Sequence, residues 1–243
     1  MSAQMNSGFW HLPRNAALHG GALDRHLLLN LWVAMGLLAL AHLVLLVGLA
    51  IRRGGRARSK VLLEYAPLAG LCLIFLGLAI KAETLWAAQR YTGADLSAMQ
   101  VEVTGMQFAW YFRYPGPDAA FGETKLSLAS AAEGNPLGID PADAHGRDDI
   151  VSSQLVLPVG REVDLALRAQ DVIHGFSVPE MRLKQNAVPG LTVHIHFTPQ
   201  VAGEYAILCT QVCGMGHYRM NATMRVVPQA EFEAWLKAHE VRP

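Results

Sequence analysis

The chain has 243 residues, of which 52% are hydrophobic and 16% are charged, and its formal net charge is zero. This composition is too apolar for a purely soluble protein. The sequence contains no nucleotide-binding glycine loop and no basic patch for nucleic acid, so neither function is indicated.

Two long apolar runs near the N-terminus predict a transmembrane helical hairpin over residues 27–86. Residues 27–51 contain no Lys, Arg, Asp or Glu and would span roughly 37 Å as a helix. The second run, about residues 61–81, carries only Glu64 as a charge up to Ile80 and would span roughly 30 Å. The first run is too long for the core of a signal peptide, and no small-residue cleavage site follows it.

The loop between the two runs predicts the orientation of the chain in the membrane. Residues 52–60 hold five basic side chains and no acid, namely Arg52, Arg53, Arg56, Arg58 and Lys60. The positive-inside rule places this loop in the cytoplasm. We therefore expect a multi-pass protein of the cell (inner) membrane, with an N-terminal extracytoplasmic tail (1–26) and an extracytoplasmic domain (87–243) on the periplasmic side.

The extracytoplasmic domain shows patterns typical of short strands. Residues 101–114 are rich in β-branched and aromatic side chains, and in the run 162–169 the residues Val163, Leu165 and Leu167 alternate with more polar ones. Further strand patterns cover 153–160, 191–199, 204–209 and 222–227, and 229–240 predicts a short amphipathic helix. This pattern predicts an all-β domain, an antiparallel sandwich or Greek-key barrel.

Residues 115–149 form a long irregular insertion between two of the predicted strands. Between Asp118 and Asp149 it holds two basic and seven acidic side chains, a net charge of −5. A solvated acidic loop accounts for this charge, and so does a docking surface for a basic partner.

The stretch "CTQVCGMGHYRM" contains four side chains that can bind a metal ion. Cys209, Cys213, His217 and Met220 are spaced by four, four and three residues. A disulfide is permitted outside the cytoplasm but explains neither the histidine nor the methionine, and a thioether is a poor ligand for zinc. Thiolate, imidazole and thioether together favour copper.

The second cysteine indicates more than one copper ion. A mononuclear site with two histidines, one cysteine and one methionine would leave a thiolate over, whereas two thiolates can bridge two coppers that each need an imidazole. The missing imidazole is sought at His174, in a predicted loop, because His194 and His196 lie in mid-strand. His145 lies in the insertion and His239 in the terminal helix.

Three segments resemble subunit II of heme-copper cytochrome c oxidases. They are "DVIHGFSVPEMRLKQNAVPG", "GEYAILCTQVCGMGHYRM" and the aromatic "VTGMQFAWYF", behind a two-span hairpin. The resemblance implies a cupredoxin-like Greek-key barrel with a dinuclear copper centre, CuA. Two bridging cysteines, one histidine on each copper, a weak methionine ligand and a weak main-chain carbonyl would hold it: Cys209, Cys213, His174, His217, Met220 and the carbonyl of Gln211.

The resemblance also implies the function and the partners. Cytochrome c would deliver electrons to CuA, which passes them to a heme in subunit I. There the hemes and CuB reduce O2 to water while protons are pumped, and subunit III is a further partner. No Cys-x-x-Cys-His occurs, so the donor heme is expected on another protein, soluble or tethered.

Five residues bear on features of the family beyond the copper ligands. Gln211 and Asn186 stand where the family commonly has carboxylates that bind magnesium or manganese, which argues against a hard-metal site here. Phe108 replaces a tryptophan associated with electron entry and Trp110 matches a second one, so electrons are expected to enter near this strand, with Trp110 preferred. Glu64 either marks the entrance of a proton path in subunit I or extends to the lipid headgroups.

Other functions would use similar ligands. A membrane-tethered copper-binding or copper-transfer protein is the main alternative, although it does not need a two-span hairpin. The related subunit of quinol oxidases lacks the copper ligands, and nitrous oxide reductase, which shares the motif, is soluble.

Overall fold

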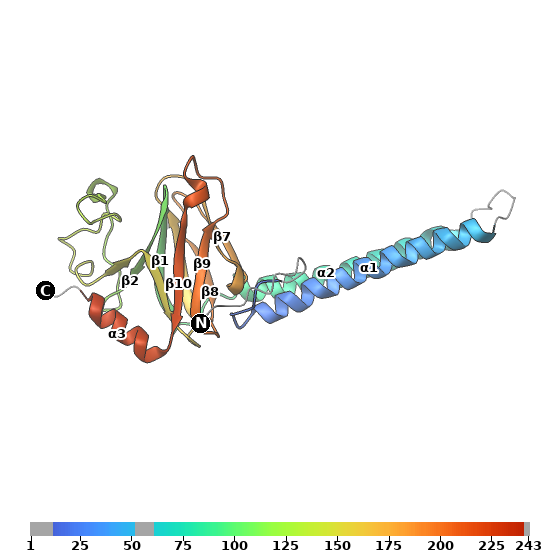
Figure 1. The fold of residues 1–243 in the computed structure, drawn as a ribbon, viewed down its shortest axis with the longest axis horizontal. Helices are drawn as coiled ribbons and strands as arrows, with labels where there is room; N and C mark the ends of the chain where they lie inside the picture. The colour runs from blue at the N-terminus through green and yellow to red at the C-terminus, as the bar shows by residue number, and fades with distance from the viewer. Residues whose placement is uncertain (1–11, 52–60, 241–243) are drawn as a thin grey trace. The chain divides into compact units, whose positions relative to one another are not determined.

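The structure, a computed structural model, describes residues 12–51 and 61–240. The chain divides into two compact units (Figure 1). One is the helical unit Gly21–Thr92, and the other, the β unit, combines Met1–Gly20 with Gly93–Pro243.

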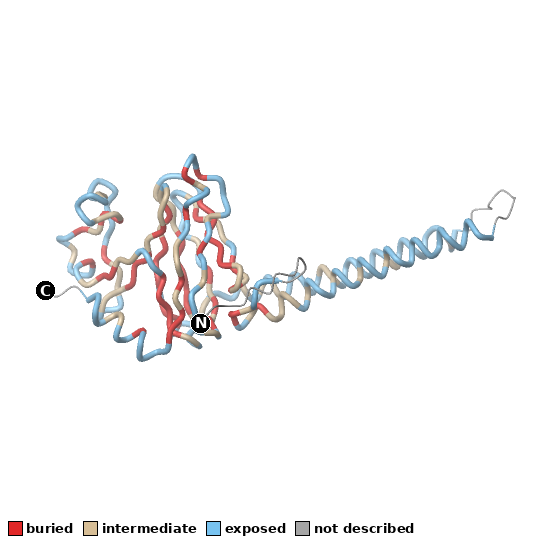
Figure 2. The backbone as a smooth tube through the Cα atoms, in the orientation of Figure 1, coloured by how far each residue is buried: buried red, intermediate tan, exposed pale blue. Residues whose placement is uncertain are grey.

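Two long apolar helices make up the helical unit, and these are α1 (Gly20–Ile51) and α2 (Val61–Arg90). Both are long and apolar enough to cross a membrane, and their most apolar stretches have no buried residue. Figure 2 shows this exposure along both helices. An apolar surface of this size is unfavourable in water, and a bilayer would cover it. The helices extend beyond the expected spans, because α1 begins before residue 27 and α2 continues past residue 81. The basic loop 52–60 lies outside the described residues.

The β unit is a sandwich of two five-stranded sheets, which matches the expected cupredoxin-like architecture. Their strand orders are β3-β2-β1-β5-β8 and β4-β10-β9-β6-β7. The strands are β1 (Met99–Met106), β2 (Ala109–Tyr114), β3 (Ile150–Ser152), β4 (Gln154–Pro158), β5 (Val163–Ala169), β6 (His174–Val178), β7 (Leu183–Ala187), β8 (Val193–Phe197), β9 (Gly203–Cys209) and β10 (Asn221–Val227). The helix α3 (Gln229–His239) follows β10.

The sheets correct two expectations. First, they are mixed and not purely antiparallel, because β1 pairs with β5 and β4 pairs with β10 in parallel. The chain crosses between the sheets without a helix, so no helical pattern announces these parallel pairs. Second, His174 does not lie in a loop: it is the first residue of β6, and all five residues of this strand are buried. A strand covered on both faces loses the alternation that marks it in a sequence.

The core lies between the two sheets (Figure 2). Val163, Leu165 and Leu167 are fully buried on the face that their alternation predicts. Ile195 and Phe197 of β8 are buried as well, whereas Leu191, ahead of this strand in the same alternation, is 57% exposed. Tyr114 ties the layers together, because its hydroxyl accepts a hydrogen bond from Val156 N (2.7 Å) and donates one to Val156 O (3.1 Å).

Part of the predicted N-terminal tail belongs to the β unit. Ala16 and Ala17 are buried in its core, and Ala17 forms an isolated bridge with Pro199, just past the end of β8. The segment that leads into α1 is thus held by the sandwich at the point where the helix begins.

The insertion 115–149 is irregular, as its composition predicts, with a single short 3-10 helix at Leu126–Leu128. A buried ion-pair network anchors its end to the sheet. Arg113 on β2 pairs with Asp149, donates to the carbonyl of Gly122 and lies 3.0 Å from Glu102 of β1. The insertion is therefore fixed at its base to the strands that carry it.

Candidate metal centre

The predicted copper ligands meet at one end of the inner strands β6 and β9 of the sheet β4-β10-β9-β6-β7. His174 begins β6 and Cys209 ends β9. These strands are antiparallel neighbours, with Phe176 opposite Cys209, so the start of one lies beside the end of the other. The loop 210–220, which connects β9 to β10, carries the remaining ligands.

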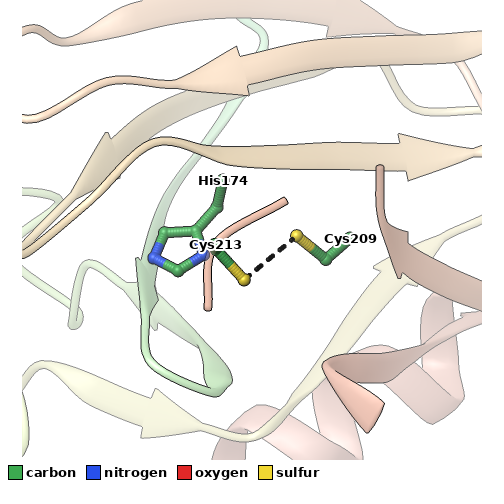
Figure 3. A group of neighbouring side chains, drawn as sticks. All are labelled: His174, Cys209 and Cys213. Atoms are coloured by element: carbon green, nitrogen blue, oxygen red, sulfur yellow. Dashed lines mark hydrogen bonds between the residues drawn. The ribbon is translucent and has the colours of Figure 1, made fainter. Parts of the chain in front are cut away.

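The cysteine sulfurs form the middle of the site (Figure 3). The Sγ atoms of Cys209 and Cys213 lie 3.8 Å apart and both thiols are free, whereas a disulfide bond is about 2.05 Å long. The Sγ of Cys213 lies 3.7 Å from Nδ1 of His217 and 3.7 Å from Sδ of Met220. The carbonyl oxygen of Gln211 lies 3.2 Å from the Sγ of Cys209.

His174 completes the cluster from the other strand. One ligand atom from each of His174, Cys209 and Cys213 lies within 4.8 Å of the other two. The ring of His174 is fully buried. Its Nε2 lies 2.8 Å from Oδ1 of Asp171, and its Nδ1 is buried without a hydrogen-bond partner.

This donor set fits copper. A buried imidazole nitrogen without a partner carries a free-energy cost that a metal ion removes. A histidine that binds a metal usually bonds a carboxylate through its other nitrogen, as His174 does with Asp171. Two thiols, imidazole and thioether are soft to intermediate ligands, which copper prefers over hard cations.

Gly175 allows the copper loop to lie directly on β6. A Cβ at Gly175 would come within 2.6 Å of Thr210 Oγ1 and 2.8 Å of Gln211 N. The backbone N of Thr210 donates to the carbonyl of Gly175 at 2.8 Å. A side chain at this position would push the cysteine loop away from His174.

The turn between β1 and β2 holds the loop from the other side. Gln107 donates from Nε2 to the carbonyl of Cys213 (2.6 Å) and from its backbone N to Oδ2 of Asp171 (2.7 Å). The ring of Phe108 lies against Gly216, where a Cβ would meet it at 2.5 Å. The turn thus positions both sides of the ligand cluster.

Burial and hydrogen bonding set the ionisation of two groups in the site. Burial, with a smaller contribution from neighbouring Cys209, raises the pKa of the Cys213 thiol to about 11. A metal that binds this sulfur must therefore displace a proton. Partial burial opposes ionisation of Asp171, but hydrogen bonds from His174, Gln107 and Val172 hold the pKa of Asp171 below its usual value.

The three other predicted functional residues lie in different environments. Trp110 is 1% exposed, and its ring stands edge to face against those of His174 (5.8 Å between centroids) and Phe176 (5.4 Å). No docking protein can touch it. Phe108 is half-buried, with the Arg219 guanidinium 5.9 Å from its ring centroid. Glu64 lies in the first turn of α2, in the helical unit.

Sequence reasoning missed two residues of the site, Asp171 and Gln107. Asp171 precedes His174 by three residues, so a carboxylate inside the ligand motif was a usable signal. No sequence signal pointed to Gln107, because its contacts with Cys213 and Asp171 depend on how the strands are ordered.

Comparisons with known proteins identify the family of the chain. A family model described as cytochrome c oxidase subunit II, periplasmic domain, matches residues 99–227. The alternative cytochrome c oxidase subunit 2 of Bradyrhizobium diazoefficiens is 36% identical over 161 residues, covering 65% of this chain and 57% of the relative. Cytochrome c oxidase subunit 2 of Thermostichus vulcanus is 34% identical over 140 residues, covering 58% and 33%.

A solved structure is also similar to part of the chain. The periplasmic domain of subunit II of cytochrome oxidase of Bradyrhizobium japonicum is 26% identical, covering 58% of this chain and 92% of that one, with a TM-score of 0.43. The family model alone spans more than half of the chain and includes all the predicted copper ligands. The chain therefore belongs to the cytochrome c oxidase subunit II family.

Proposed function

We propose that this chain is the electron-entry subunit of a proton-pumping terminal oxidase and holds a dinuclear CuA centre. One observation carries the proposal: the sulfurs of Cys209 and Cys213 lie 3.8 Å apart beside a buried His174 whose Nδ1 has no hydrogen-bond partner. Two adjacent thiols, this buried imidazole and the imidazole of His217, 3.7 Å from Sγ of Cys213, are the donors that a pair of thiolate-bridged coppers needs.

Six residues of the site would bind the two coppers. Cys209 and Cys213 would bridge them, His174 and His217 would each bind one, and Met220 and the main-chain carbonyl of Gln211 would be weak ligands. When bound, the centre supplies one-electron transfer with little change in geometry. The packing of β6, the copper loop and the β1–β2 turn holds the ligands in place and excludes water, which keeps reorganisation small.

Electrons would enter across the exposed side of the copper loop. Val212, Met215 and Tyr218 are 79%, 94% and 85% exposed there, and apolar surface of this kind suits a transient protein partner. Phe108 at the edge of this surface and Tyr218 within it are aromatic side chains that cytochrome c can reach. Trp110, preferred on sequence grounds, would act only from inside, as packing beside His174.

The partners and the orientation follow from the family and the helices. The apolar helices α1 and α2 would lie against subunit I, which carries the hemes and CuB for reduction of O2 to water, with subunit III as a further partner. Both termini and the β unit would lie on the periplasmic side of the cell membrane. With Gln211 and Asn186 in place of carboxylates, we propose that the magnesium or manganese site of the family is weak or missing.

Copper loading of the full-length chain tests the centre. We expect two copper ions per chain and a paramagnetic spectrum of one electron shared between two copper nuclei. Cys209→Ser and Cys213→Ser should each abolish this spectrum, and Cys72→Ser in α2 is the matched control that should retain it. One copper or fewer per chain in correctly loaded protein would refute the centre.

Co-purification with heme separates the oxidase from a membrane-tethered copper-transfer protein, and a second measurement tests the role of Glu64. An oxidase subunit purifies from its native membrane together with heme, and a copper-transfer protein does not. If Glu64 marks a proton path, Glu64→Gln slows oxidase turnover while the copper spectrum stays the same. Unchanged turnover would leave Glu64 as a side chain that extends to the headgroups.

A further inference from the structure

Gln107, in the turn between β1 and β2, hydrogen-bonds to both sides of the ligand cluster. Its side-chain Nε2 donates to the carbonyl of Cys213 at 2.6 Å. Its backbone N donates to Oδ2 of Asp171 at 2.7 Å, and Oδ1 of Asp171 lies 2.8 Å from Nε2 of His174. Gln107 and Asp171 therefore connect two predicted ligands that come from different parts of the chain.

The side chain of Gln107 supports the middle of the copper loop. Among the described residues, its bond to Cys213 is the only hydrogen bond that reaches residues 211–218 from outside the segment 209–220. Thr210, at the start of the loop, is bonded to β6 instead. The position of the middle of the loop therefore depends on the side chain of Gln107.

Two glycines allow the turn to lie directly on the loop. A Cβ at Gly214 would come within 2.8 Å of Nε2 of Gln107, and φ at Gly214 is +133°, which disfavours other residues. A Cβ at Gly216 would meet the ring of Phe108 at 2.5 Å. This close packing keeps the amide of Gln107 against the carbonyl of Cys213.

The carbonyl that Gln107 binds belongs to the central ligand of the cluster. The Sγ of Cys213 lies 3.8 Å from the Sγ of Cys209, and it lies 3.7 Å from both Nδ1 of His217 and Sδ of Met220. A shift of the Cys213 backbone changes all three distances at once. Groups that hold ligands in place from behind commonly affect metal affinity and redox potential.

We propose that Gln107 is a positioning residue of the copper centre and sets the place of Cys213 relative to His174. This inference rests on the proposed CuA centre. The side chain of Gln107 holds the sulfur side of the cluster, and its backbone holds the carboxylate of Asp171 behind the imidazole. Methionine has a similar length and no donor, so Gln107→Met breaks the first link and leaves the second in place.

Alkylation of Cys213 by iodoacetamide tests the first link in the full-length, copper-free chain. Cys213 is 4% exposed, so it reacts when the loop opens. Loss of one hydrogen bond of ordinary strength should make alkylation of Cys213, followed by mass spectrometry, about two- to tenfold faster in Gln107→Met. An unchanged rate would overturn the proposal.

Gln100→Met is the matched control for this test. Gln100 lies on β1, is exposed, and its side chain makes one contact of 3.5 Å, with the carbonyl of Ala98. Its variant should react as the unaltered chain does. Gln107→Asn, whose amide is one methylene too short to reach the Cys213 carbonyl, should show the same increase as Gln107→Met and serves in its place if the methionine variant does not fold.

Copper loading then tests the position of the ligands. In loaded Gln107→Met we expect a changed copper hyperfine pattern, a shifted reduction potential and loss of copper to a chelator at least about twofold faster. A role in folding alone would lower the Tm and leave the hyperfine pattern and the potential unchanged, which would overturn the proposal.

The two tests separate this inference from the proposed function. If the unaltered chain gives the two-copper spectrum and Gln107→Met matches it in spectrum and potential, the role of Gln107 is refuted and the copper centre stands. If the unaltered chain binds one copper or fewer, the proposed function is refuted, and the alkylation rate of Cys213 still shows whether Gln107 holds the loop.

Discussion

Replacing Asp171 with asparagine tests whether the carboxylate beside His174 supports copper binding. The carboxylate accepts three hydrogen bonds: from His174 Nε2 (2.8 Å) and Val172 N (2.7 Å) at Oδ1, and from Gln107 N (2.7 Å) at Oδ2. Asparagine has one acceptor oxygen, so its amide NH2 must face either the N–H of Gln107 or the ring of His174. In the first orientation Gln107 N loses its partner, and in the second both His174 Nε2 and Val172 N lose theirs.

The expected loss follows from the position of Asp171 behind a ligand. Removing the carboxylate behind a metal-bound histidine typically lowers metal affinity by about 10- to 100-fold, or about 1.4 to 2.7 kcal/mol. We expect a loss in this range for Asp171→Asn. Either His174 loses its hydrogen-bond acceptor, or residue 171 loses its hydrogen bond to Gln107 in the β1–β2 turn.

Competition with a copper chelator measures this change. Asp118→Asn is the matched control, because Asp118 lies in the insertion and bonds His145 and not a copper ligand. Its copper affinity should equal that of the unaltered chain. If Asp171→Asn binds copper within twofold of the unaltered chain, the hydrogen bond to His174 does not support the site and the reasoning is wrong.

Three further predictions concern electron entry, the core and pH. Phe108→Ala should slow cytochrome c oxidation with the copper spectrum unchanged, and an oxidation rate equal to that of the unaltered chain would exclude electron entry at Phe108. Trp110→Ala should instead lower the free energy of unfolding by about 3–5 kcal/mol, because the ring is buried. Tyr114→Phe should lower the free energy of unfolding by about 1–3 kcal/mol, because Val156 N and O lose their partner; thermal unfolding that matches the unaltered chain would contradict this. Because burial raises the pKa of the Cys213 thiol to about 11, the proton competes with copper, and copper affinity should rise by at least about tenfold per pH unit through neutral pH; an affinity independent of pH after correction for the competitor would argue against a protonated thiol.

The sequence predicted the core face of β5 correctly, although Asp164 and Ala166 on the other face of this strand are buried too. Val163, Leu165 and Leu167 alternate with more polar neighbours, so a period of two is enough to mark the face that enters the core. The same argument fails for β6, which has only five residues and begins with the polar His174, and for the parallel pairs, which no local pattern encodes.

The sequence by itself determined the chemistry: two apolar runs, a set of sulfur and imidazole ligands at fixed spacing, and the family that carries them. These depend on residue type and local order alone. Only the tertiary structure decided which residues surround the site. It placed His174 beside the cysteines through the β6–β9 pairing, enclosed Trp110, and brought Asp171 and Gln107 behind the ligands. Such contacts depend on strand order, which brings distant segments together and which no local pattern records.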